Sequence, residues 1–260
     1  MSLALAAAAV VNLVVGAIVG LCGVAGFLLP MFYVGSLSMG VAESLALSFA
    51  AFIVSGVLGS ISYRKAGNLD IPFGIRLSVG SLAGALLGVK LNLIIPEAQV
   101  KVILYLVVLL SGISILLRKD KKSSSEPGGH EGAKKEKGLL GNLPLTLLLG
   151  FVTGIICSLS GAGGPVLVMP LLVVLGMPIR TAVGVALFNS IFIGIPAAVG
   201  YLTQCDIGAV LPFLAAALVS HGIGVFYGSR MAVKVNQTLL KRGVAVFSIL
   251  LSIGKLTGIM

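Results

Sequence analysis

The chain is poor in charge. Only 10% of its 260 residues are charged, whereas 58% are hydrophobic, and the mean hydropathy is +1.15. Soluble globular chains carry about 25% charged residues, so the composition excludes that class. Apolar runs far longer than the roughly 20 residues that cross a bilayer predict an all-α polytopic membrane protein.

The chain also lacks the residue patterns of several common functional sites. Its three cysteines, Cys22, Cys157 and Cys205, show no CxxC or other metal-ligand spacing, and the apolar runs contain no cluster of His, Cys and Asp. We therefore expect no disulfide, no metal and no cofactor. The N-terminus has no basic region, so we interpret the first apolar run as mature transmembrane structure and not as a signal peptide.

The net charge of +10 indicates membrane topology and not nucleic-acid binding. The basic residues lie mainly in short stretches between apolar runs, as they do in cytoplasmic loops. The most hydrophilic stretch, 118–142, contains seven Lys and Arg residues and a Ser- and Gly-rich run, which is typical of a disordered linker. It separates an N-terminal transmembrane half, 1–117, from a C-terminal half, 143–260.

The two halves show the same order of hydrophobic segments. Each half opens with a segment that ends in a glycine-rich break, followed by a short segment and three longer ones. The predicted segments are 3–21, a short one from 26, 42–63, 72–93 and 97–117, then 143–156, 165–175, 180–202, 207–233 and 237–256. This order predicts a duplicated chain with about five segments in each repeat.

Residue matches at an offset of 140 support the duplication. Gly84 and Gly88 with Lys90 fall on the second-half GxxxG unit at 224–228 with its basic residue at 230. With an odd number of segments in each repeat, the second repeat can have the opposite orientation to the first. Inverted repeats place fifteen of the eighteen basic residues on the cytoplasmic side, whereas parallel repeats place eleven there. The sequence therefore predicts inverted repeats. The GxxxG units are equally consistent with internal packing and with a homodimer.

A break at 158–170 interrupts the second half at what we expect to be membrane depth. Glycine and proline at this density end a helix, and Pro165 is a favourable first residue for a new one. Irregular backbone inside a bilayer is tolerated only where it is buried in protein or lines a cavity. The free N–H groups of the restarting helix favour an anion. The alternative is that the glycines only allow helices to pack closely.

The chain resembles the TauE/SafE family of sulfite exporters over nearly its whole length. The resemblance is carried by the two halves, the hydrophilic central loop, and a glycine-rich element before a proline in each half, at 20–30 and 160–170. The first element has Val24 and Ala25 where the family usually has glycines, so the second is the stronger candidate site. The resemblance implies transport of a sulfur-containing anion such as sulfite, thiosulfate or a sulfonate.

An oxyanion inside a membrane needs hydrogen-bond donors that replace water. Fixed cations are scarce in the predicted spans, so we expect backbone dipoles, hydroxyls and the amide of Asn189, in the middle of a span, to bind the anion. The candidate substrate-binding residues are Ser158, Ser160, Gly161, Gly163, Gly164, Asn189 and Ser190 in the second half, and Gly23, Gly26 and Ser48 in the first.

Two ionisable residues within the apolar runs are candidates for proton coupling. His221 lies near the centre of its span, where an ionisable side chain indicates a transport pathway or a proton relay; a neutral packing role is the alternative. Glu43 lies near the outer end of its span and can also cap that helix or face water.

The expected function is a secondary membrane transporter that exports a sulfur-containing anion from the cell by alternating access between its repeats. A passive anion channel on the same scaffold is an alternative. An intramembrane serine protease that uses Ser160 and His221 is another, and it requires the two side chains in hydrogen-bond contact. We expect a multi-pass protein of the cell membrane with a cytoplasmic linker, and no enzymatic activity.

Overall fold

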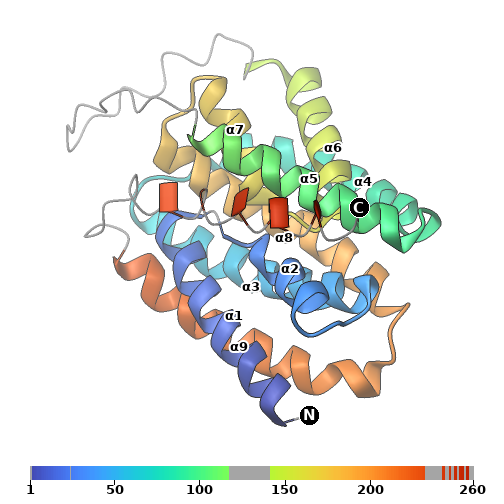
Figure 1. Ribbon diagram of the computed structural model, residues 1–260. Coiled ribbons are helices and arrows are strands. Elements are labelled where there is room, and N and C mark those ends of the chain that lie inside the picture. Colours follow the sequence, from blue (N-terminus) through green and yellow to red (C-terminus); the bar gives the residue numbers. More distant parts are fainter. Residues whose placement is uncertain are drawn as a thin grey trace.

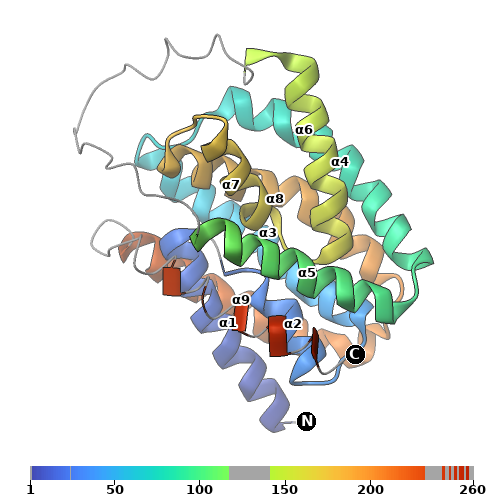
Figure 2. The same cartoon turned by 45° about the horizontal axis from the view of Figure 1, so that its top comes forward.

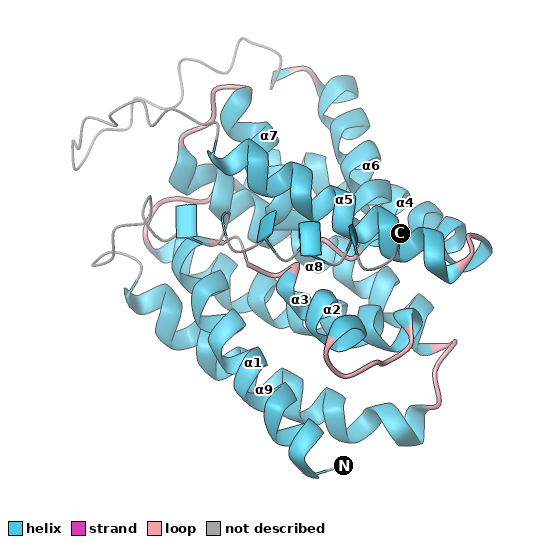
Figure 3. Cartoon of the chain, in the orientation of Figure 1, coloured by secondary structure: helices cyan, strands magenta, loops and turns pink. Residues whose placement is uncertain are grey.

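The computed structural model describes residues 2–23, 25–116 and 141–231, and short pieces at 242–243, 246, 249–250, 252–254 and 256–257. These residues form helices joined by short loops, with no strand among them (Figures 1 and 3). The helices are α1 (Ser2–Cys22), α2 (Leu28–Gly35), α3 (Val41–Lys65), α4 (Ile71–Ile94), α5 (Glu97–Leu116), α6 (Leu143–Ser160), α7 (Gly164–Val174), α8 (Ile179–Leu202) and α9 (Ile207–Met231).

The predicted all-α polytopic membrane fold is confirmed. Among the described residues, six helices are long and apolar enough to cross a membrane, namely α1, α3, α4, α6, α8 and α9. More than half of the predicted segment 237–256 and nearly all of the predicted linker lie outside the described residues.

Helices α3 and α8 form the centre of the fold, and they are the most buried of the six spans. They occupy equivalent positions in the two halves and run in opposite directions. The contacts that show this direction join Gly194 to Phe49 and Gly56 to Leu187. Equivalent helices that run antiparallel are the mark of inverted repeats, so the predicted inversion is confirmed.

Two outer helix pairs flank this centre, α1 with α9 and α4 with α6 (Figures 1 and 2). Each pair joins one helix from each half. The close contacts of α9 with α1 recur at the equivalent positions of α4 and α6. A methyl group on any of four glycines would meet a main-chain oxygen of the facing helix. These contacts are Gly224 to Leu13 and Gly228 to Ala17 in the first pair, and Gly84 to Phe151 and Gly88 to Ile155 in the second.

The two GxxxG units are therefore used inside the molecule. Small residues at a crossing let two backbones approach closely in the absence of a hydrophobic driving force between helices. The sequence left internal packing and dimerisation equally open for these units. The structure places both units at internal crossings.

Helices α2 and α7 are re-entrant. Helix α1 runs parallel to α9, and α9 runs parallel to α3, because Gly222 meets Val54 and Ser229 bonds Ser62. Since α1 and α3 run in the same direction, the chain between them must turn back. The same reasoning applies to α7 between α6 and α8. With 8 and 11 residues, α2 and α7 are too short to cross a bilayer.

Candidate functional site

The second glycine break forms where α6 ends and α7 begins. Gly161 ends α6 with a φ of 70°, and Gly163 precedes α7 with a φ of 75°, both in the left-handed region that glycine enters without strain. Pro165 lies in the first turn of α7, as predicted. The predicted break and restart are confirmed.

The carbonyl groups freed at the end of α6 bind side chains from two other helices. The Tyr201 hydroxyl donates to the Ser158 carbonyl oxygen at 2.8 Å, and the Asn92 amide donates to the Leu159 carbonyl oxygen at 2.6 Å. These bonds satisfy the acceptors that a helix C-terminus leaves open. The sequence analysis missed both residues, because only the fold brings α4 and α8 to this point.

The first break begins with the same geometry as the second, although Ala25, 138 residues before Gly163, has no positive φ and α2 begins only at Leu28. Gly23 has a φ of 72° and its N–H donates to the Val19 carbonyl, as the N–H of Gly161 does to the Cys157 carbonyl. Gly23 and Gly26 lie 138 residues before Gly161 and the glycine that starts α7. The departure from a run of three glycines has not removed the break.

The two breaks meet on opposite edges of the Phe52 ring. A Cβ atom at Gly26 would lie 2.8 Å from Cε1 of this ring, and a Cβ atom at Gly163 would lie 3.0 Å from Cε2. Phe52 lies near the middle of α3, and Ser190, near the middle of α8, faces Gly164. The breaks therefore meet halfway along the two central helices.

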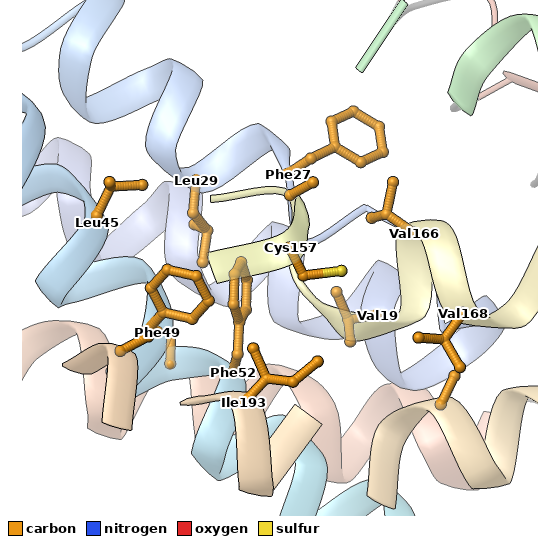
Figure 4. Packing of buried hydrophobic residues seen from close by; sticks show 14 of the residues in the cluster. Val19, Phe27, Leu29, Leu45, Phe49, Phe52, Cys157, Val166, Val168 and Ile193 are labelled. Carbon is orange, nitrogen blue, oxygen red and sulfur yellow. The ribbon is translucent and has the colours of Figure 1, made fainter. Parts of the chain in front are cut away.

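Apolar side chains surround the Phe52 ring (Figure 4). Phe49 meets it edge to face at a centroid distance of 5.6 Å and stacks on Tyr201. Figure 4 shows Val19 of α1, Cys157 of α6 and Ile193 of α8 in the same buried cluster. In this conformation the ring and its neighbours occupy the space between the breaks.

The predicted serine hydroxyls are buried, and each donates its proton to a carbonyl four residues earlier in its own helix. Such bonds are common for serines in apolar helices. Because each O–H is already donated to a carbonyl, these hydroxyls can bind an anion only if they rotate. The bonds are Ser48 to Ser44, Ser158 to Gly154, Ser160 to Ile156 and Ser190 to Ala186.

Asn189 is the predicted site residue that retains unused donors. Its side-chain oxygen accepts a hydrogen bond from the Ser78 hydroxyl of α4 at 3.0 Å, while its buried Nδ2 has no partner. The side chain bonds toward α4, and the neighbouring Ser190 faces the start of α7. Ser78, one of many serines in the chain, had no distinguishing signal in the sequence.

The candidate protease pair is not formed. The Ser160 hydroxyl donates to Ile156 and accepts the N–H of Ala162. His221 is fully buried in α9, and neither of its ring nitrogens has a hydrogen-bond partner. Ser160 and His221 therefore do not form the hydrogen-bonded pair of nucleophile and base that a serine protease needs.

Glu43 caps the start of α3. Its carboxylate accepts the N–H of Gly40 at 3.2 Å, which satisfies one donor of the helix N-terminus. It also lies close enough to Cys205, in the α8–α9 turn, to affect that thiol: burial and the Glu43 charge raise the pKa of Cys205 above its ordinary value.

Replacing Glu43 by glutamine is expected to speed alkylation of Cys205 by a maleimide roughly two-fold at neutral pH. Removing the negative charge lowers the pKa of the thiol and increases the reactive thiolate, and in both proteins the rate should rise with pH. Mass spectrometry of the Cys205 peptide measures the rate, with Cys205→Ser as the unlabelled control. Slower labelling of the Glu43 variant would contradict this account.

Comparison with known proteins places the chain in a family. A family model described as "Sulfite exporter TauE/SafE" matches residues 4–254. The probable membrane transporter protein YdhB of Bacillus subtilis is 24% identical over 77% of this chain and 79% of its own length. A probable membrane transporter protein of Haemophilus influenzae is 24% identical over 94% of both chains. No solved structure matches the chain. Because the family match includes both breaks and all six spans, the chain belongs to the TauE/SafE sulfite exporter family of membrane transporters.

Proposed function

We propose that the protein is a secondary transporter that exports a sulfur-containing anion, such as sulfite, thiosulfate or a sulfonate, across the cell membrane. The observation that carries this proposal is the meeting of two re-entrant helix starts at the centre of the fold, on the two edges of Phe52. Helix N-termini present free N–H groups and a positive dipole end, which favour an anion. The family membership supports the sulfur chemistry.

The anion binds between the start of α7 and α8. The backbone N–H groups near Gly163 and Gly164 and the free amide of Asn189 supply its donors. Binding requires Phe52 to leave the space between the breaks, Ser190 to rotate, and the Asn189 amide to turn from Ser78 of α4 toward α7. The matching break at Gly23 and Gly26 completes the site from the other repeat.

Alternating access follows from rocking one repeat against the other, around the antiparallel pair α3 and α8. The apolar packing around Phe52 favours a carrier over an open channel, because the space between the breaks is filled in this conformation. The cell-membrane location, with the linker between the repeats, 118–142, in the cytoplasm, is supported by the excess of basic residues on that side.

Replacing Asn189 by leucine is expected to abolish anion binding while the protein still folds. The leucine side chain has similar volume but no N–H donors for the anion. The test is a thermal-shift panel in detergent with sulfite, thiosulfate, sulfate, taurine, sulfoacetate and chloride, because a ligand that binds only the folded protein stabilises it, by about 2.7 kcal/mol at one hundred times its Kd.

The matched control is Ser78→Ala, which removes the partner of the Asn189 oxygen and keeps the amide donors. This variant should keep the stabilisation by the anion. An Asn189→Leu protein that is stabilised as strongly as the wild type would move the site away from α8. If no anion in the panel stabilises the wild type at millimolar concentration, the transport proposal fails.

A further inference from the structure

A second group of buried polar side chains lies away from the breaks, where α1, α2 and α9 meet. The Asn12 amide of α1 donates to the Tyr33 hydroxyl of α2 at 2.6 Å and to the Ala8 carbonyl at 2.8 Å. Its own oxygen, Oδ1, has no partner, and both nitrogens of His221 on α9 have none. All three side chains are fully buried.

Helix packing brings Asn12 and His221 to the same place. A methyl group at Gly16 would lie 2.5 Å from the main-chain oxygen of His221, so the two backbones are in contact. Because α1 and α9 run parallel and side chains lean toward the helix N-terminus, the imidazole extends to the level of Asn12, one turn before Gly16. The main-chain carbonyl of Asn12 lies beside the ring, but it does not meet the geometry of a hydrogen bond to either ring nitrogen.

The equivalent crossing in the other half does without these side chains. At the contact between α4 and α6, Ser81 stands where α9 has His221, and Gly150 stands where α1 has Asn12. Both crossings bring glycine into backbone contact in the same way. The imidazole and the amide are therefore not needed to pack helices of this geometry, although leaving their polar atoms unpaired in a membrane interior costs free energy.

We propose that His221, with Asn12 and Tyr33, forms a proton-binding site that couples anion transport to proton movement. This inference rests on the proposed function. The proton binds the free imidazole nitrogen, so that both ring nitrogens become donors and one of them can bind the free Oδ1 of Asn12. Asn12 in turn holds Tyr33 on α2, which links the charge of the imidazole to the re-entrant helix of the first break.

The proton and the anion favour each other's binding. A buried imidazolium is costly when alone, and an anion bound in the same low-dielectric interior offsets part of that cost. His221 lies at the depth of the breaks, because its neighbour Gly222 packs on Val54, two residues from Phe52. Coupling of this kind is reciprocal, so the protonated protein binds the anion more tightly by the same factor by which the anion increases proton affinity.

The other titratable groups near the site are few. Helix α1 carries no charged side chain, and α2 contributes the Tyr33 phenol. Helix α3 has its charges, Glu43, Arg64 and Lys65, at its two ends. Arg230 of α9 lies more than two turns after His221, where it packs over the Phe226 ring. Among these groups, the imidazole is the one whose ordinary titration range includes physiological pH.

The first test observes the imidazole directly. The chain has two histidines, so His130→Gln leaves His221 as the one remaining, and its ¹⁵N signals can be followed in detergent over about pH 4 to 8.5. We expect a reversible titration whose midpoint rises by at least about one pH unit with saturating thiosulfate, a ten-fold gain in proton affinity. Thiosulfate is the probe because it does not itself take up protons in this range. A ring that never titrates overturns the proposal.

The second test measures thiosulfate binding as a function of pH. Wild-type affinity should be greatest at low pH and fall about ten-fold as the pH rises through the titration of His221. His221→Gln, which keeps a neutral polar side chain, should bind with an affinity that does not change with pH. The control Ser81→Ala, at the equivalent crossing, should behave as the wild type.

The outcomes separate this proposal from the proposed function. Thiosulfate binding that depends equally on pH in the wild type and in a folded His221→Gln protein overturns the proton site and leaves the transporter intact. A titrating imidazole whose midpoint ignores bound thiosulfate also overturns the coupling. Failure of every sulfur anion to bind at any pH ends the proposed function, and the coupling with it.

Discussion

A single methyl group at Gly224 is expected to destabilise the protein by on the order of 3 kcal/mol, the upper part of the range for an overpacked core. The added Cβ of Gly224→Ala would meet the main-chain oxygen of Leu13 and lie 2.8 Å from the main-chain nitrogen of Ala17. Backbone atoms inside two packed helices cannot rotate away, so α1 and α9 must separate. Gly84→Ala should have the same effect on α4 and α6, because its contacts are equivalent.

The matched control is Gly222→Ala, in the same helix and two residues away. Its Cβ would lie 3.3 Å from the tip of the Val54 side chain, which can move slightly. Thermal unfolding in detergent, followed by size-exclusion chromatography, should show Gly224→Ala melting on the order of 10 °C lower than wild type and Gly222→Ala close to it. Equal stability of the two variants would contradict the close crossing of α1 and α9.

Replacing Phe52 by alanine is expected to cost about 3 kcal/mol of stability and to allow anions to leak. Both breaks contact this ring, Gly26 on one edge and Gly163 on the other. Removing it leaves a cavity between the two re-entrant helices, so the central barrier no longer separates the two sides of the membrane. In proteoliposomes, efflux of radiolabelled sulfite without a counter-substrate should rise at least ten-fold, and counterflow should lose saturation.

Phe192 provides the control for this experiment. It lies 140 residues after Phe52 in the equivalent helix, but its ring contacts Phe188 at a centroid distance of 5.2 Å and contacts neither break in the contacts described above. Phe192→Ala should not increase the leak. Phe52→Leu, which fills more of the space, should fold well and show an intermediate leak. If proteoliposomes with either Phe52 variant leak no more than those with the wild type, the barrier lies elsewhere.

Local signals in the sequence were sufficient to predict the six spans of the described residues and the breaks, although the predicted span 97–117 forms α5, which is not one of the six. Glycine and proline act on the backbone where they occur, so the end of α6 and the restart at Pro165 could be predicted without any tertiary contact. The inverted repeats followed from the distribution of basic residues, which depends on the membrane and not on side-chain packing.

The contents of the site could not be predicted in the same way. A phenylalanine in an apolar span has no signal that separates Phe52 from Phe192, because only the fold places one ring between the breaks. The serine hydroxyls were predicted to donate to an anion, but in the structure they donate to main-chain carbonyls of their own helices. Ser78, Asn92 and Tyr201 act on residues far away in the sequence, so their partners appear only when the helices are packed.

The exchange of helices between the two outer pairs has a consequence for biosynthesis. Helix α1 is made before the other helices described here, yet the backbone it packs against, in α9, is made about two hundred residues later. Until then its glycine face lies open to lipid or to the insertion machinery, as does that of α4 until α6 emerges. Each half therefore completes the other, and a ribosome that stops after the first half leaves a chain whose closest contacts have no partner.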